Sequence, residues 1–371
     1  WLRGFVDRIR TRKQVLCDEV LVDGKTLLVS GMPGREVDRY YLIESTPLEG
    51  VIALKGKLRN NLVLFGVFSL ALSLIVGFML AGQFLRPIGD LSEGVRAIQE
   101  GRFQHRIGLT MTDELGQLST SFNSTMERLE ELSVAHTVQE SLFPVGALVH
   151  GCWEVYGRSV TATELGGDYY DYFALDDTYL IVLIGDVAGH GTASALLMAM
   201  AKAVITVETK KDPHPVQVME AINSMIFSAM RKKRMMTFFY GLLNINTGEM
   251  IYSNAGHNSP FLLTEKGEFI ELTSSGYPLG TRKAAKFVEK SVVMGPNDRL
   301  WIYTDGIAET HDPAGEPLGY EGMRRLFHGA TGKDSNDCCQ AVFDGCVKFR
   351  ENHPQDDDMT VILIRPKPSV V

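Results

Sequence analysis

The sequence predicts an α+β protein whose β-rich part is preceded by a membrane-spanning helix. In residues 146–371, short apolar runs rich in β-branched and aromatic residues alternate with glycine-containing turns, which is the pattern of β-strands. Two helical patterns interrupt these strands, at 193–210 and 215–232. One uncharged apolar segment, 62–85, lies upstream and is too long to be a strand. The chain is therefore expected to divide into a membrane-linked part and a β-rich part.

Composition limits the classes of function. At 371 residues the chain is long enough for two or three domains, and 45% hydrophobic residues is high for a fully soluble protein. A net charge of -8 argues against nucleic acid as the main partner, because a nucleic-acid-binding face is normally basic. The five cysteines do not form an even disulfide framework. Cys338, Cys339 and Cys346 lack zinc-site spacing, so we expect them to pack within a helix.

Residues 62–85 form the predicted transmembrane helix. At about 1.5 Å per residue, a helix of this length crosses a hydrocarbon core about 30 Å thick. The positive-inside rule does not settle its orientation, because basic residues flank both ends. These residues are Lys55, Lys57 and Arg59 before the span and Arg86, Arg96 and Arg102 after it.

Residues 1–61 are expected to be the tail of a larger extracytoplasmic sensor domain. A hairpin is predicted at 20–29 about Asp23-Gly24, with further strands at 40–44 and 50–54. So short a segment makes a poor independent core. Because the chain begins with Trp1, we expect it to be a fragment or to have been trimmed.

Two amphipathic helices are predicted after Pro87, which is expected to break the membrane helix. Their apolar residues recur at helical spacing: Ile88, Leu91, Val95 and Ile98, then Leu115, Leu118, Phe122, Met126, Leu129 and Leu132. With Pro87 and Asp113-Glu-Leu-Gly116, residues 86–132 resemble a HAMP domain. HAMP domains are parallel four-helix bundles made by two chains, so the resemblance implies a homodimer. The alternative is two ordinary helices that pack on another core, although each is too short to bury its stripe alone.

A linker helix is expected at 133–145, where the apolar seam becomes polar at His136 and Gln139 before Pro144 ends the helix. Polar seam positions weaken a coiled coil and can make its packing adjustable. A merely solvated helix end fits these residues equally well.

Acidic residues next to small residues recur in the β-rich part. The apolar run 179–184 leads to Asp186 and a glycine-rich turn, and similar settings surround Asp168, Asp305 and the run 356–358. We expect these carboxylates at strand ends. Clustered carboxylates repel one another unless cations lie between them, and oxygen ligands favour hard ions such as Mg2+ or Mn2+. The alternative is a set of unrelated surface turns.

These motifs resemble those of the metal-dependent PPM-type Ser/Thr phosphatases in their SpoIIE/RsbU-like branch. The resemblance covers about 133–365 and implies a PPM-type β-sandwich flanked by helices over 146–371. The motifs that carry it are Gly166-Gly-Asp-Tyr-Tyr-Asp171, Gly185-Asp-Val-Ala-Gly-His-Gly191, Asn254-Ala-Gly-His-Asn-Ser-Pro260, Thr304-Asp-Gly306 with Glu309, and Asp357-Asp-Met-Thr360.

The resemblance implies two divalent cations, Mn2+ or Mg2+, with Asp186 between them. The carbonyl of Val187 would add a ligand, and Asp305 and Asp357 would complete one ion. Asp168 would hold the attacking water on its ion. Side chains alternate along a strand, so Asp356, Asp357 and Asp358 cannot all face the same ion.

Two histidines in these motifs, His190 and His257, are candidate acids for the departing serine. A structural hydrogen-bonding role is the alternative for each of them.

The expected function is a membrane-anchored sensor phosphatase that hydrolyses phosphoserine or phosphothreonine on a partner protein. By resemblance, the partner is a STAS-domain anti-anti-sigma factor in partner-switching control of transcription. The phosphatase domain would lie in the cytoplasm at the bacterial inner membrane, with residues 1–61 outside. The alternatives are a catalytically inactive signalling scaffold and a hydrolase of small phosphoesters.

Overall fold

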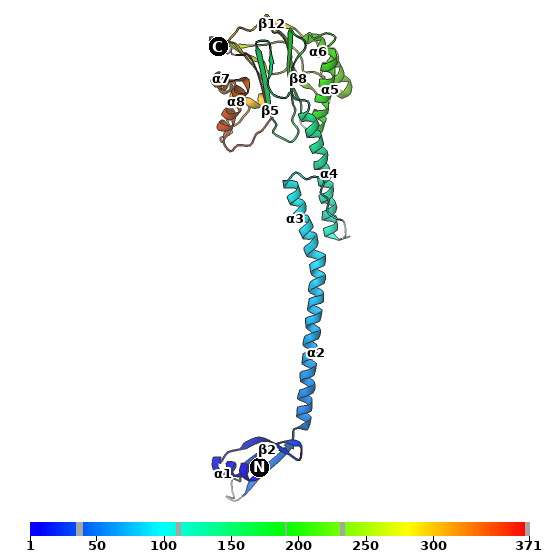
Figure 1. The fold of residues 1–371 in the computed structure, drawn as a ribbon, viewed down its shortest axis with the longest axis vertical. Coiled ribbons are helices and arrows are strands. Elements are labelled where there is room, and N and C mark those ends of the chain that lie inside the picture. The colour runs from blue at the N-terminus through cyan, green and yellow to red at the C-terminus, as the bar shows by residue number, and fades with distance from the viewer. Residues whose placement is uncertain (35–39, 109–112, 190, 231–233, 368–371) are drawn as a thin grey trace. The chain divides into compact units, whose positions relative to one another are not determined.

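The computed structural model describes residues 1–34, 40–108, 113–189, 191–230 and 234–367, and Figure 1 labels their helices and strands. The chain separates into two compact units. One consists of 1–102 with 107–120, and the other of 103–106 with 121–371.

The first unit begins with a small sheet of three antiparallel strands in the order β1-β2-β3. Its elements are α1 (Leu2–Arg12), β1 (Leu16–Val22), β2 (Lys25–Pro33) and β3 (Tyr41–Pro47). The predicted hairpin is confirmed, because Asp23 and Gly24 connect β1 to β2 with φ of 49° and 78°, as a type I′ turn requires. Helix α1 was not predicted. It buries Phe5 and Ile9 against Val29 of β2.

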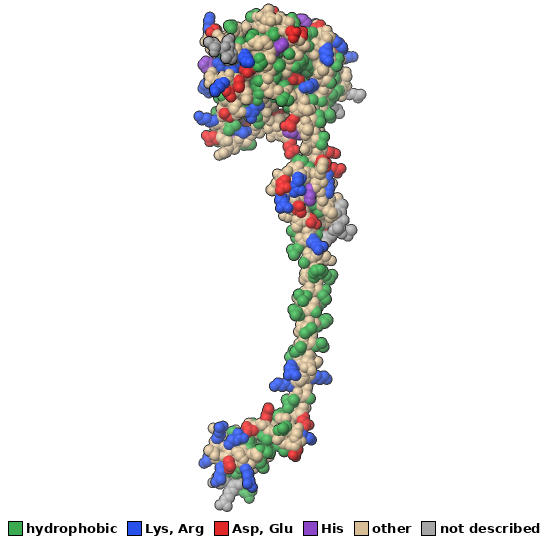
Figure 2. Space-filling model, viewed as in Figure 1, with side chains coloured by type: hydrophobic (Ala, Val, Ile, Leu, Met, Phe, Trp, Pro, Cys, Tyr) green, Lys and Arg blue, Asp and Glu red, His purple; other side chains and the backbone are tan. Residues whose placement is uncertain are grey.

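A long helix follows this sheet. It comprises α2 (Glu49–Leu80), the π-helical turn η1 (Ala81–Leu85) and α3 (Arg86–Gln99). It is long and apolar enough to cross a membrane, by length and composition. No α2 residue is buried, and Figure 2 shows hydrophobic side chains along it. The strand predicted at 50–54 is wrong, because these residues form the first helical turns, whose hydrogen bonds lie within the helix.

Pro87 does not break this helix, contrary to the prediction. It lies in the first turn of α3, directly after the π-helical turn. A proline lacks a backbone N–H and clashes with the preceding turn, and a π turn supplies the wider ladder that relieves this clash. The helix therefore continues from the apolar span into α3.

Helix α3 buries small residues rather than all of its predicted apolar seam. Gly94 and Ala97 are buried, whereas Ile88 and Val95 are 53% and 52% exposed. The second predicted seam lies on α4 (Glu114–Glu140), which also contains most of the linker segment.

The second unit contains two antiparallel sheets. One has the order β12-β9-β8-β7-β6 and the other β11-β10-β13-β14-β5-β4. The strands of the first are β6 (Asp168–Ala174), β7 (Tyr179–Val187), β8 (Met236–Asn244), β9 (Glu249–Ala255) and β12 (Lys290–Val293). Those of the second are β4 (Leu148–His150), β5 (Trp153–Val160), β10 (Phe261–Leu263), β11 (Phe269–Glu271), β13 (Arg299–Tyr303) and β14 (Met359–Pro366).

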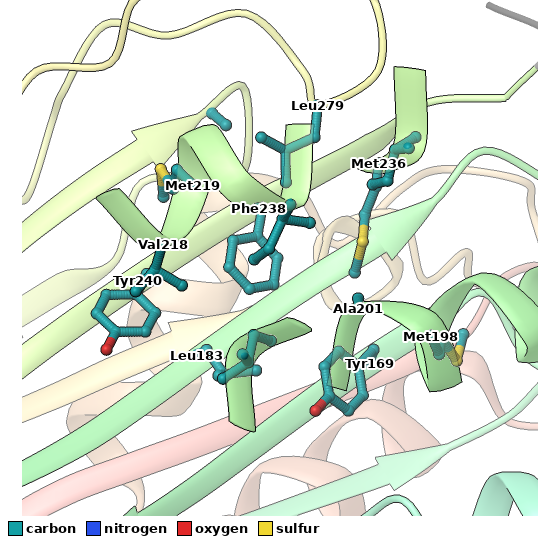
Figure 3. Packing of buried hydrophobic residues seen from close by; sticks show 14 of the residues in the cluster. Tyr169, Leu183, Met198, Ala201, Val218, Met219, Met236, Phe238, Tyr240 and Leu279 are labelled. Carbon is teal, nitrogen blue, oxygen red and sulfur yellow. The ribbon is translucent and has the colours of Figure 1, made fainter. Parts of the chain in front are cut away.

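Alternating side chains on β7 decide how the layers stack. Val182 and Ile184 enter a core shared with the second sheet, whereas Ile181 and Leu183 enter a core shared with two helices. These helices are α5 (Thr192–Glu208) and α6 (Pro215–Met230). Figure 3 shows Leu183 and its neighbours on β8 facing them.

Strand β14 shows the same alternation on the other side of the sandwich. Ile362 and Ile364 face the shared core, while Val361 and Leu363 pack with α7 (Gly319–Gly329) and α8 (Ser335–Arg350). The cysteines expected to pack within a helix are buried on α8 in this third core. The domain is therefore a β-sandwich flanked by helices, as the sequence analysis expected.

Two leucines of α5 provide a matched test of this packing. Leu197 is fully buried against the sheet, whereas its neighbour Leu196 is 65% exposed. Leu197→Ala should reduce the free energy of unfolding by about 2–5 kcal/mol, because it leaves a cavity in the core. Leu196→Ala should change it by no more than about 0.5 kcal/mol. Urea unfolding followed by tryptophan fluorescence measures both, and equal effects would contradict the assigned orientation of α5.

Candidate metal centre

Strand pairing brings the first two predicted carboxylates together. β6 and β7 are antiparallel, and their register places Asp168 directly opposite Asp186. Asp168 begins its strand rather than ending one, so that part of the strand-end prediction is wrong. An antiparallel pair joins the start of one strand to the end of the next, which explains how the two carboxylates meet.

The second sheet contributes the other predicted carboxylates in the same way. Asp305 follows β13 and Asp357 precedes β14, and these strands are antiparallel neighbours through the pair Tyr303 and Val361. The two sheets are joined at this point, because the Thr304 hydroxyl donates a 2.8 Å hydrogen bond to Asp168. The structure therefore gathers all four sequence motifs at one end of the sandwich.

Burial and neighbouring negative charges raise the pKa of two of these carboxylates, Asp168 and Asp186. Burial raises the pKa of Asp186 to about 7, with the negative charges of Asp305 and Asp357 as further causes. Burial and the charge of Asp186 raise the pKa of Asp168 well above its usual range. A cation between these groups would remove that repulsion.

The donor set suits a hard cation. A side chain on Gly167 would place its Cβ 2.9 Å from the Val187 carbonyl oxygen and 3.0 Å from Asp186 Oδ1. The Gly189 carbonyl oxygen would lie 3.2 Å away. Glycine thus leaves a space bordered by three oxygens, the atom type that Mg2+ and Mn2+ prefer. In the described part of the chain, no three His, Cys, Asp or Glu side chains are already arranged as a cation site.

Two threonines that the sequence analysis did not identify hold Asp168. Its Oδ2 accepts hydrogen bonds from Thr304 at 2.8 Å and Thr360 at 2.6 Å. Asp168 is 3% exposed, so these hydroxyls fix its orientation in a buried setting. Its other oxygen keeps its capacity to accept hydrogen bonds.

The three successive aspartates before β14 have different surroundings, as their alternation predicted. Asp356 is exposed and lies 2.8 Å from His311 Nδ1. Asp357 Oδ1 accepts from the backbone of Asp358. Asp358 is buried and accepts from the backbone N–H groups of Ala162 at 2.7 Å and Gly167 at 2.5 Å. Asp358 therefore supports the glycine loop beside the candidate site, a role the sequence analysis did not assign.

His257 is a structural residue. It is buried, with Nδ1 2.8 Å from the Thr237 hydroxyl and Nε2 3.1 Å from the Tyr303 carbonyl oxygen. A carbonyl only accepts, so Nε2 carries the proton and Nδ1 accepts from Thr237. The ring thus joins the two sheets, and neither nitrogen is free for catalysis. The other candidate acid, His190, lies outside the described residues.

Gln139 does not occupy a two-chain seam, contrary to the prediction. It is 2% exposed, and its Nε2 donates to the Gly166 carbonyl oxygen at 2.9 Å and contacts Met198 Sδ at 3.2 Å. His136 is 43% exposed on its side chain and lies 3.7 Å from Glu140. The end of α4 therefore packs on the β-sandwich domain of its own chain, because the Gln139 amide donates to a backbone carbonyl of that domain.

Comparison with known families identifies the class of protein. Residues 176–367 match the family described as Stage II sporulation protein E (SpoIIE), and residues 79–131 match the HAMP domain. The SpoIIE match spans more than half of the chain, so the chain belongs to the SpoIIE family. The predicted resemblances to this family and to HAMP are confirmed.

Individual relatives are distant. Protein IcfG of Synechocystis sp. is 26% identical over 324 residues, which cover 75% of this chain and 51% of IcfG. The chain therefore spans about half the length of that relative. The phosphoserine phosphatase RsbU of Bacillus subtilis is 25% identical over 238 residues, or 64% of this chain and 70% of RsbU. The SiaA-PP2C domain of Pseudomonas aeruginosa has a TM-score of 0.58 at 18% identity, covering 65% of this chain and 98% of that domain. This structural match supports the fold.

The buried histidine predicts a pH-dependent stability. Burial lowers the pKa of His257 to about 4, whereas an unfolded histidine titrates near about 6.5. The unfolded state then binds more protons between these values, so His257 favours folding above pH about 6.5 and loses that contribution as pH falls toward 4. The difference amounts to about 3 kcal/mol. His257→Gln should flatten this part of the stability profile in urea titrations, and an unchanged slope would contradict the assignment.

The Gln139 contact predicts an effect on activity rather than on chain association. Gln139→Leu keeps an apolar filling against Met198 but leaves the Gly166 carbonyl without its amide donor. Phosphatase activity should fall several-fold, because Gly166 adjoins the glycine loop of the candidate site. His136→Leu is the control and should have little effect. Turnover of a phosphoprotein measures both, and equal activities would mean that the amide contact does not support the site.

Proposed function

We propose that this chain is a metal-dependent protein phosphatase that hydrolyses phosphoserine or phosphothreonine on a partner protein. The observation that carries the proposal is the convergence of Asp168, Asp186, Asp305 and Asp357 at one end of a SpoIIE-family sandwich. Similarity to the phosphoserine phosphatase RsbU supports the same reaction.

The proposed site holds two divalent cations, Mn2+ or Mg2+. Asp186 would lie between them, the Val187 carbonyl would add a ligand, and Asp305 and Asp357 would complete one ion. Such cations polarise a phosphoryl group and lower the pKa of water. Bound cations would offset the burial and the neighbouring negative charges that otherwise raise the pKa of Asp168 and Asp186.

The protein's own groups orient the reactants. Asp168 is fixed through Oδ2 by two threonine hydroxyls, which leaves Oδ1 to accept a hydrogen bond from the attacking water. Asp168 would thus hold the metal-bound water. His257 does not protonate the departing serine, because both of its nitrogens are engaged.

The proposed partner is a phosphorylated STAS-domain protein of the anti-anti-sigma type, in partner-switching control of transcription. The resemblance of the sequence motifs to the SpoIIE/RsbU-like branch implies this choice. The proposed organisation places 1–61 outside the cell as a sensor tail, 62–85 in the inner membrane, and 146–371 in the cytoplasm. A homodimer would form through the HAMP segment 86–132 and the part of the linker 133–145 that precedes Gln139, and the half-exposed Ile88 and Val95 of α3 are consistent with it.

Two other functions predict different results. A catalytically inactive scaffold would hydrolyse neither a phosphoprotein nor a small ester, although the chain keeps every expected carboxylate. A hydrolase of small phosphoesters would turn over p-nitrophenyl phosphate but not phosphorylated STAS proteins. Comparing the two substrates therefore separates all three functions.

Asp186→Asn tests the proposed chemistry. A neutral amide cannot offset two cations, so the variant should lose at least about 100-fold in activity while keeping its fold. Asp305→Asn and Asp357→Asn should behave in the same way. Asp356→Asn is the matched control, because Asp356 is exposed and pairs with His311. The Asp356→Asn variant should retain most of the wild-type activity.

The measurement is release of phosphate from a phosphorylated STAS protein with excess Mn2+, and circular dichroism checks the fold. Full activity of Asp186→Asn would rule out the assigned site.

A further inference from the structure

Arg234 lies against the backbone of the loop that follows Asp186. Its Nη1 donates to the Ala188 carbonyl oxygen at 3.0 Å and to the Ser194 hydroxyl oxygen at 3.1 Å. Arg234 lies two residues before the start of β8, and Ser194 lies in the first turn of α5. One guanidinium therefore connects the loop to two elements of the sandwich.

Ser194 extends this contact to the next residue of the loop. Its side chain is fully buried, and its hydroxyl donates to the Gly189 carbonyl oxygen at 2.6 Å. The backbone N–H of Ala188 donates to the Met235 carbonyl oxygen at 3.0 Å. Both carbonyls and one N–H of two successive loop residues are thus fixed from outside the loop.

Gly189 allows the guanidinium to approach so closely. Its φ is +89°, and a Cβ at this position would stand 3.0 Å from Arg234 Nη1. A side chain here would strain the backbone and displace the arginine. Both the positive φ of the turn and the close approach of Arg234 therefore favour glycine at position 189.

The loop that Arg234 holds is the one that presents oxygens to the candidate cation site. The Val187 and Gly189 carbonyl oxygens and Asp186 Oδ1 border the space beside Gly167. The Val187 carbonyl and the Ala188 N–H belong to one planar peptide group, so the contact of that N–H with Met235 fixes the direction of the Val187 carbonyl. Arg234 and Ser194 hold the next two carbonyls of the loop, including that of Gly189.

We propose that Arg234 and Ser194 act together as positioning residues that set the cation affinity of this site. The inference rests on the proposed metal-dependent function and adds to it the part of the chain that orients the backbone ligands. Groups that do not bind a metal themselves but hydrogen-bond to its ligands typically contribute about 10–100-fold to metal affinity. The alternative role for Arg234 is direct binding of the substrate phosphate by its guanidinium, and the two roles predict different results for Mn2+ affinity and KM.

The experiment titrates Mn2+ into the purified chain in detergent by isothermal titration calorimetry, with wild type, Arg234→Ala, Ser194→Ala and the double variant. Each single variant should bind Mn2+ about 10-fold more weakly. The double variant should be no more than slightly weaker than either, because both changes remove the same clamp. Arg234→Lys keeps one cationic donor and should recover part of the affinity.

Arg282→Ala is the matched control. Arg282 is an exposed arginine whose guanidinium stacks 3.6 Å from the Tyr277 ring centroid. Within the described residues it forms no hydrogen bond or ion pair with residues 186–189. It should bind Mn2+ like wild type. For Arg234→Ala, kcat should return to near the wild-type value at saturating Mn2+, with KM for a phosphoprotein unchanged.

The outcomes separate the inference from the proposed function. If wild type and Arg234→Ala bind Mn2+ equally, the positioning role is wrong while the metal site stands. A raised KM for phosphoprotein with unchanged Mn2+ affinity would assign Arg234 to the substrate phosphate instead and overturn the inference. If wild type binds no Mn2+, both the inference and the proposed function fail.

Discussion

Repulsion among clustered carboxylates is the constraint on which the rest of this site depends. Asp168 and Asp186 face each other across two strands, and Asp305 and Asp357 arrive from the second sheet. Burial raises the pKa of Asp186 to about 7, and the charges of Asp305 and Asp357 add to this effect. The β-sandwich can hold this carboxylate cluster because hydroxyl and backbone N–H groups donate hydrogen bonds to its oxygens and, in our account, cations bind between them.

Much of the fold followed from local patterns in the sequence. Short apolar runs rich in β-branched and aromatic residues predicted strands such as β7 and β13, and the uncharged run 62–85 predicted the apolar helix. The carboxylates were found because each stands beside glycine or another small residue. Pro87 misled the prediction, since a single sequence does not show that a π-helical turn will accommodate it.

The supporting contacts could not be predicted, because they join residues far apart in the chain. Thr360 meets Asp168 only through the pairing of two sheets, and Gln139 meets Gly166 only because α4 packs on its own core. A polar residue in a helical stripe looks the same whether it faces a second chain or a backbone carbonyl. The sequence therefore located the charged groups but not the neutral groups that orient them.

The central claim is that cations neutralise this carboxylate cluster, and proton release on metal binding tests it most directly. Because the pKa of Asp186 is raised to about 7, this carboxyl group is partly protonated at pH 6.5 before a metal ion binds. Calorimetric titration of Mn2+ in buffers of different ionisation enthalpy counts the protons released. Our account predicts net release by wild type at pH 6.5 that declines at pH 8 and is smaller in Asp186→Asn. Mn2+ binding without proton release at pH 6.5, equal in both proteins, would contradict it.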